Sequence, residues 1–167
     1  MTLTGKKRTE STSSPGVFFT IRHLNQIQRA KRDMPILKER AEYTQAVQSQ
    51  QAVLESIWGS VKRATFEDGE AGDKAFAAAR NELYVAAPAE VKAKADLLYE
   101  QQDGIFRSVI LPATIRAALV QIEGLLIDGK QILTVDDFLE QAPDTLIDEV
   151  WRLCSEASGL TADQQKN

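Results

Sequence analysis

One short segment near the N-terminus has the composition of a β-strand, and a strand cannot fold alone. Val17–Arg22 (VFFTIR) is rich in β-branched and aromatic residues, which strands favour. A single strand leaves its backbone N–H and C=O groups unpaired, so it needs partner strands. The other strand signals lie far along the chain, over about 125–133, where Asp128 and Gly129 separate two apolar runs. Because Asp-Gly readily adopts the positive φ angles of a tight turn, we predict a hairpin there. We expect Val17–Arg22 to join it in a small three-stranded sheet, formed by an N-terminal strand and a C-terminal hairpin.

The sequence that follows the first strand has a helical pattern. Asn25 is a candidate cap for a helix that runs to about Asp33, and Pro35 suits the first turn of a second helix. This second helix has an apolar stripe long enough to exceed about 25 residues. Gln50 and Gln51 interrupt the stripe, and we interpret them as a solvated patch. Packing within the domain is therefore favoured over an extended coiled coil. The stripe consists of Ile36, Leu37, Tyr43, Val47, Leu54, Ile57, Trp58 and Val61.

Three further helices are expected before the hairpin. Gly69 and Gly72 mark a loop, and a helix follows from about Asp73 to Ala86. Pro88 opens another helix, and Pro112 begins the last of the three. The apolar positions of that last helix are Ile115, Ala118, Leu119 and Ile122.

Two short helices are predicted after the hairpin. Thr134 can accept a hydrogen bond from the amide of Asp137, while Asp136 and Asp137 lie on the positive first turn, each effect being worth roughly 0.5–1 kcal/mol. The first helix ends before Pro143, because the residue before a proline is pushed out of the helical region. Asp144 caps the second. The acidic residues of this region thus have a structural explanation.

These elements define a mainly α fold. A chain of 167 residues that is 43% hydrophobic is long enough for one domain with one core. We expect a single mainly helical domain over 17–160, with its two short C-terminal helices over 135–158. Residues 1–16 are polar and rich in Ser and Thr, so they cannot bury enough surface to offset the entropy of ordering, and we expect a disordered tail. Residues 161–167 are expected to form a flexible C-terminus.

The acidic hairpin region does not fit the pattern of a calcium loop. Such a loop places oxygen ligands at positions 1, 3, 5 and 12 around a glycine at position 6. If Gly129 is that glycine, the ligand positions are occupied by Gly124, Leu126, Asp128 and Val135. One oxygen ligand in four is too few for calcium. We predict no metal site and no cofactor.

Residue types that carry catalytic chemistry are scarce. His23 is the only histidine and Cys154 the only cysteine, which disfavours a histidine-activated nucleophile, a zinc site and an intrachain disulfide. No glycine-rich phosphate loop occurs, and acidic pairs such as Asp148 and Glu149 are adjacent in a helix and point in different directions. We interpret His23 as a surface residue at a strand end and Cys154 as a buried structural thiol. The chain is predicted not to be an enzyme and to have no catalytic residues.

Charge and hydropathy narrow the class of partner. The net charge is −4, and the basic clusters Lys6–Arg8 and Arg29–Arg32 lack a recognisable docking motif for nucleic acid. No run of about 18 apolar residues occurs, and no apolar segment follows the basic N-terminus, so neither a membrane span nor a secretion signal is predicted. A lone cysteine suits a reducing cytoplasm. We predict a cytoplasmic protein that binds polypeptides, with no nucleic acid and no membrane as partner.

The order of the parts is itself informative. A strand leads into a helix (VFFTIRHLNQIQRAKRD), a helical middle follows, and a further helix leads through a glycine into a hairpin and two helices (IEGLLIDGKQILTVDDFLEQAPDTLIDEVWRLCSEASGL), before a terminal Lys-Asn. Over most of residues 17–167 this order resembles the tail assembly chaperones of long-tailed bacteriophages and related prophages. The resemblance implies a non-catalytic protein of the bacterial host cytoplasm that binds the tape measure protein and keeps it soluble until tail tube subunits polymerise around it. That task requires apolar grooves for amphipathic helices.

Two other functions fit the same pattern. One is a virion structural or head-tail adaptor protein that stays in the phage particle, and the other is a helical DNA-binding regulator. Within the chaperone hypothesis, the tail tube protein is a possible second partner, and self-association is a further possibility. The sequence does not identify the partner-binding residues.

The C-terminus allows a test at the level of the gene. The resemblance implies that a longer form is made by a minus-one ribosomal frameshift near the end of the short one. Gln165, Lys166 and Asn167 can be encoded as CAA AAA AAY, which contains the slippery heptamer A AAA AAY in the required phase. We predict that sequencing the gene reveals this heptamer and an overlapping reading frame downstream. An AAG codon at Lys166, or no open frame beyond, would contradict the prediction.

Overall fold

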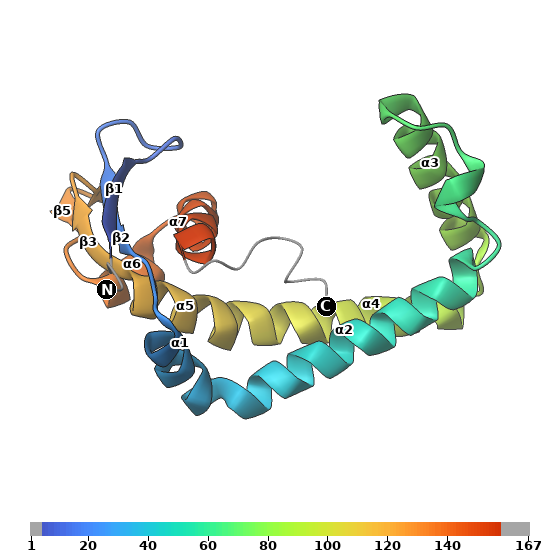
Figure 1. The fold of residues 1–167 in the computed structure, drawn as a ribbon, viewed down its shortest axis with the longest axis horizontal. Helices are drawn as coiled ribbons and strands as arrows, with labels where there is room; N and C mark the ends of the chain where they lie inside the picture. Colours follow the sequence, from blue (N-terminus) through green and yellow to red (C-terminus); the bar gives the residue numbers. More distant parts are fainter. Residues whose placement is uncertain (1–4, 158–167) are drawn as a thin grey trace. The chain divides into compact units, whose positions relative to one another are not determined.

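A computed structural model describes residues 5–157, which form two compact units. Unit 1 contains residues 5–37 and 107–157, and unit 2 contains residues 38–106 (Figure 1). The described residues are mainly helical and include a small three-stranded antiparallel sheet that joins N-terminal and C-terminal segments. This confirms the predicted fold class. The single domain over 17–160 stays a prediction, and the expected flexible C-terminus, 161–167, lies outside the described residues.

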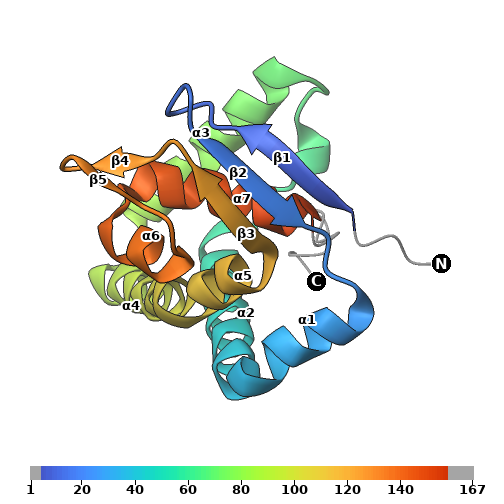
Figure 2. The ribbon, with the colours of Figure 1, turned by 90° about the vertical axis from the view of Figure 1, so that its left-hand side faces the viewer.

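The sheet of unit 1 has the strand order β1-β2-β3 (Figure 2). The strands are β1 (Lys6–Glu10), β2 (Phe18–Arg22) and β3 (Leu119–Glu123), and both pairings are antiparallel. Phe19 and Ile21 of the central strand are buried, whereas the alternate residues Phe18, Thr20 and Arg22 are only partly covered. This alternation is typical of a sheet with one face against the core.

The predicted disordered tail over 1–16 is wrong for its described part, because Lys6–Glu10 forms the edge strand β1. The backbone of β1 pairs with β2, and these hydrogen bonds offset the conformational entropy lost on ordering the segment, which its polar side chains alone do not offset. The Arg8 guanidinium lies 3.6 Å from the ring centroid of Phe18 and donates a 2.8 Å hydrogen bond to the Glu123 carboxylate. The segment is thus ordered by contacts to residues far away in the sequence.

The strand contributed by the C-terminal half also differs in detail from the expectation. The helix that begins near Pro112, α5 (Leu111–Ala118), ends before the expected apolar positions Leu119 and Ile122, which instead lie in β3. The hairpin forms a separate two-stranded sheet, β4 (Leu126–Ile127) with β5 (Lys130–Gln131). Its predicted tight turn is confirmed, with φ of 48° at Asp128 and 75° at Gly129.

A glycine separates β3 from this hairpin. Gly124 has φ of 78°, and a Cβ atom there would lie 2.5 Å from the backbone oxygen of Gly16. Only glycine combines this backbone conformation with such a close approach. The turn at Gly124 directs the chain out of the main sheet, so the hairpin does not extend that sheet.

The core of unit 1 lies between the sheet and three helices. α7 (Asp144–Ala157) packs on β2 and α5, and α6 (Val135–Gln141) packs on β3 and α5. The rings of Phe19 and Phe138, both fully buried, meet edge to face with centroids 5.8 Å apart. Other fully buried side chains are Ile115, Val150 and Cys154.

Two helices of unit 1, α1 (Gln26–Asp33) and α6, begin with the cap residues that the sequence predicts. The Thr134 hydroxyl accepts a hydrogen bond from the Asp137 amide at the start of α6. Asn25 caps α1, and its side chain and that of Gln28 each bond to the other's backbone amide. Such a reciprocal pair satisfies two donors that a helix start otherwise leaves open.

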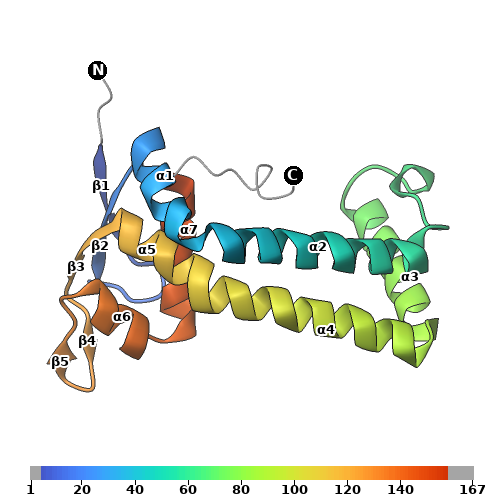
Figure 3. The same ribbon diagram turned by 90° about the horizontal axis from the view of Figure 1, so that it is seen from below.

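Unit 2 contains three α-helices and a short 3-10 helix, Arg63–Thr65; the α-helices are labelled in Figure 3. They are α2 (Leu37–Trp58), α3 (Glu70–Ala86) and α4 (Ala89–Ile105), and α2 has 22 residues, shorter than the length its stripe allows. The loop expected at Gly69 and Gly72 ends earlier, because Gly72 is the third residue of α3. A Cβ at Gly72 would lie 1.7 Å from the Glu67 backbone oxygen, so the glycine permits a close contact within the loop before α3.

Helices α2 and α4 lie side by side (Figure 3). The rings of Tyr43 and Phe106 are 6.3 Å apart at one end, and the Gln50 amide donates a 3.4 Å hydrogen bond to the backbone oxygen of Ala95, which is buried. The interpretation of Gln50 as part of a solvated patch is therefore wrong, because its amide bonds across the helix pair. Gln51, one residue on, is exposed as expected.

The fold predicts a large effect of truncating the central aromatic pair. Phe138→Ala removes a fully buried ring that contacts Phe19, so the free energy of unfolding should fall by about 3–5 kcal/mol in urea denaturation. Leu133→Ala is the control, because Leu133 is 63% exposed and should change stability by less than about 1 kcal/mol. Equal effects of the two substitutions would contradict the described core.

Candidate functional site

The acidic residues near the hairpin take separate structural positions. Asp128 forms the hairpin turn, the Asp137 carboxylate accepts a 2.6 Å hydrogen bond from the hydroxyl of Thr134, the cap residue of α6, and Asp136 accepts a 2.9 Å hydrogen bond from the Arg116 guanidinium. Within residues 5–157, no group of three or more His, Cys, Asp or Glu side chains is placed to hold a metal ion. The structure does not bring these carboxylates together as one site.

The single histidine and the single cysteine are also accounted for. His23, exposed and directly after β2, has Nδ1 2.6 Å from the backbone oxygen of Ala157. Cys154 is fully buried in α7, and burial raises the pKa of its thiol to about 12. A thiol that stays protonated is a poor nucleophile. The prediction of a buried structural thiol is confirmed.

One carboxylate that the sequence did not single out is buried and strongly bonded. Glu149 of α7 accepts five hydrogen bonds from the backbone and side chains of residues 11–13. They include a 2.8 Å bond from the Ser11 hydroxyl and a 2.6 Å bond from the Thr12 amide. Burial favours a raised pKa, but the bonds from Ser13, Thr12 and Ser11 outweigh it and lower the pKa of Glu149 to about 2. Glu149 therefore fixes the β1–β2 turn to α7.

Sequence reasoning missed this contact because its partners are more than 130 residues apart. It did correctly separate Asp148 from Glu149: Asp148 is exposed and Glu149 buried. No local pattern indicates which of two adjacent helical acids meets the N-terminal turn. All the hydrogen-bond donors to the Glu149 carboxylate belong to unit 1. We therefore interpret Glu149 as a residue that stabilises the fold.

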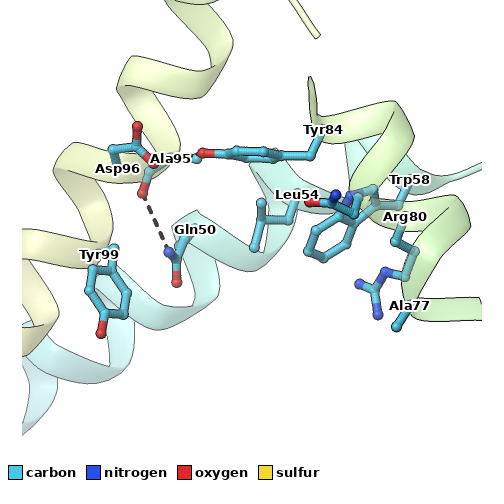
Figure 4. A pocket seen from close by; sticks show the side chains of 10 residues that line it. Gln50, Leu54, Trp58, Ala77, Arg80, Tyr84, Ala95, Asp96 and Tyr99 are labelled. Carbon is cyan, nitrogen blue, oxygen red and sulfur yellow. Dashed lines mark hydrogen bonds between the residues drawn. The ribbon is translucent and has the colours of Figure 1, made fainter. Parts of the chain in front are cut away.

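Unit 2 contains the groove that we define as the candidate site (Figure 4). Its volume is about 490 Å³, and residues of all three helices line it. Three aromatic side chains, Trp58 of α2, Tyr84 of α3 and Tyr99 of α4, dominate the wall. The other lining residues are Gln50, Leu54, Ala77, Arg80, Asn81, Ala95 and Asp96.

Two polar contacts organise this groove. The Tyr84 hydroxyl donates a 2.6 Å hydrogen bond to the Asp96 carboxylate, and this bond raises the pKa of Tyr84. The Arg80 guanidinium lies 3.5 Å from the Trp58 ring centroid and 5.2 Å from that of Phe76. Stacking of this kind fixes a guanidinium through the negative face of the ring. The groove therefore has an apolar wall with one oriented cation.

Sequence reasoning identified only part of this groove. Trp58 and Leu54 belong to the predicted apolar stripe of α2. Arg80 and Tyr84 fall within the helix predicted from about Asp73 to Ala86, but the sequence analysis assigned no binding role to them or to Tyr99. A signal did exist in α3: Phe76, Arg80 and Tyr84 recur at intervals of four, which places a cation between two aromatic rings on one helix face.

The Glu149 contact predicts a pH-dependent stability. Because folding lowers the pKa of Glu149 from 4.5 to about 2, its contribution is fully present above the unfolded value and is lost as pH falls toward 2. Glu149→Gln should lower the free energy of unfolding by about 2 kcal/mol near pH 7, and the difference from wild type should shrink between about pH 5 and about pH 2.

Thermal or urea unfolding across this pH range measures the effect. Asp148→Asn is the matched control, because it removes a neighbouring but exposed carboxylate and should change stability by less than about 0.5 kcal/mol. A Glu149→Gln effect that stays constant with pH would contradict the described bonding.

Comparisons with known proteins do not identify a relative of this chain. No family model, curated protein or solved structure matches this chain. In the part of the chain that the structure describes, no helix is both long and apolar enough to cross a membrane.

Proposed function

We propose that this chain is a tail assembly chaperone of a bacteriophage or prophage, which binds the tape measure protein in the bacterial host cytoplasm and keeps it soluble during tail assembly. The observation that carries the proposal is the aromatic groove of unit 2. Such a groove suits a helix of another protein, since amphipathic helices bind by placing their apolar face in an apolar groove.

Exposed apolar side chains of unit 2 support this proposal. Val85 and Leu97 are each 65% exposed and Tyr99 is 57% exposed, although all three have large apolar surfaces. Covering a side chain of this size stabilises a complex by about 1.5–3 kcal/mol. A helical client with a regular apolar stripe offers matching surface.

The roles of the polar side chains also favour adhesion over catalysis. The Asp136 carboxylate forms a salt bridge with Arg116, the Asp137 carboxylate accepts a hydrogen bond from the Thr134 hydroxyl, and the Glu149 carboxylate holds the β1–β2 turn. The Cys154 thiol is fully buried. These groups stabilise the fold. The proposal therefore assigns the chain a binding role without turnover.

Co-expression tests this function directly. We predict that the tape measure protein encoded by the neighbouring gene is largely insoluble alone, becomes soluble when co-expressed with this chain and co-purifies with it. A tape measure protein that stays insoluble and does not co-purify would overturn the proposal.

Two further measurements separate the competing functions. Mass spectrometry of purified virions should not detect this chain, because an assembly chaperone leaves the particle; stoichiometric amounts there would favour a virion structural or head-tail adaptor protein. A salt-sensitive shift of DNA in a gel would favour a DNA-binding regulator.

A further inference from the structure

The Arg80 guanidinium in the groove is oriented but unpaired. Other arginines near acids form ion pairs, such as Arg63 with Asp73 at 2.7 Å and Arg116 with Asp136 at 2.9 Å. Arg80 instead stacks on Trp58 and Phe76, and no acid among the described residues pairs with it. A guanidinium has five N–H donors in a planar fork that matches a carboxylate. Arg80 therefore presents donors without an acceptor.

Two further polar groups bear on what the groove can bind. The one carboxylate in its wall, Asp96, accepts the hydroxyl hydrogen of Tyr84. The buried indole N–H of Trp58 has no hydrogen-bond acceptor among the described residues. A buried donor without an acceptor is costly, so the wall favours a ligand that supplies oxygen atoms.

We propose that the groove binds an amphipathic helix of the partner protein, with one Asp or Glu carboxylate of that helix on Arg80 and one of its large apolar side chains against Trp58, Tyr84 and Tyr99. The inference rests on the proposed function and names the surface and the chemistry that the client uses. A groove of about 490 Å³ is large enough for side chains projecting from one helix.

Charge determines which kind of partner fits. Acidic side chains outnumber basic ones over residues 38–106, so a nucleic acid or a strongly acidic tract is repelled by the unit as a whole. A partner helix with a single carboxylate beside its apolar face can pair with Arg80 and carries too little negative charge to be strongly repelled by the rest of the unit. Arg80 also covers one face of Trp58, which removes that face as a stacking platform for a nucleobase.

Two designed peptides test the proposal on the full chain. Both are fluorescein-labelled amphipathic helices of about 20 residues with a Leu and Phe face, and they differ in one residue beside that face, Glu or Gln. Fluorescence anisotropy gives the affinity of each. The Glu peptide should bind about tenfold more tightly than the Gln peptide, because it adds a charge-assisted hydrogen bond.

Two variants of α3 locate the effect. Arg80→Gln should abolish the preference for the Glu peptide, whereas Lys74→Gln should preserve it, since Lys74 is an exposed cation of the same helix that pairs with Glu70. Circular dichroism checks that both variants keep their helices. Equal affinities for the two peptides, no binding of either, or a preference that survives in Arg80→Gln would overturn the proposal. A wild-type dimer that dissociates in Arg80→Gln would also overturn it, by identifying a second copy as the occupant.

Co-expression with the tape measure protein separates the two levels of the argument. If wild type and Arg80→Gln solubilise it equally well, the groove assignment fails and the chaperone function stands. If wild type does not solubilise it but the Glu peptide preference depends on Arg80, the groove assignment stands and the chaperone function fails.

Discussion

The pairing of β2 with strands on both sides is the constraint on which unit 1 depends. β1 lies in the N-terminal segment, and β3 lies about 100 residues after β2 in the sequence. The backbone N–H and C=O groups of β2 are therefore all paired only when these two parts of the chain meet. Phe19 of β2 then contacts Phe138 of α6, and α7 packs on the same strand. The Glu149 carboxylate adds a second link between the same parts, through the turn that joins β1 to β2.

Patterns with a local cause were predictable from the sequence, and patterns with a distant cause were not. The Asn25 and Thr134 caps and the Asp128–Gly129 turn depend on residues within a few positions, so composition and spacing were sufficient. The strand at Lys6–Glu10 was missed because a polar segment becomes ordered only through β2, Phe18 and Glu123. Likewise, Leu119–Glu123 continues a helical pattern in sequence but is extended in the structure, since β2 needs a second partner.

The candidate site was less predictable than the fold. Trp58 lay on a predicted apolar stripe, but the groove also needs Tyr99 and Arg80, which come from two other helices of unit 2. Their convergence depends on how α2, α3 and α4 pack against one another, and the apolar periodicity of a single helix does not predict that packing. By contrast, the acids near the hairpin have structural roles: Asp128 forms the turn, Asp136 pairs with Arg116, and Asp137 bonds to the cap residue Thr134. The proposed binding role therefore rests on the aromatic groove, whereas the acids near the hairpin make contacts within the fold.

Hydrogen–deuterium exchange on the complex with the tape measure protein tests the central claim most directly, because it maps the contact surface without altering a residue. The account predicts slower amide exchange on complex formation in segments 50–58, 77–84 and 95–99, which line the groove. Protection confined to residues 5–37 and 107–157, with unchanged exchange in unit 2, would contradict it.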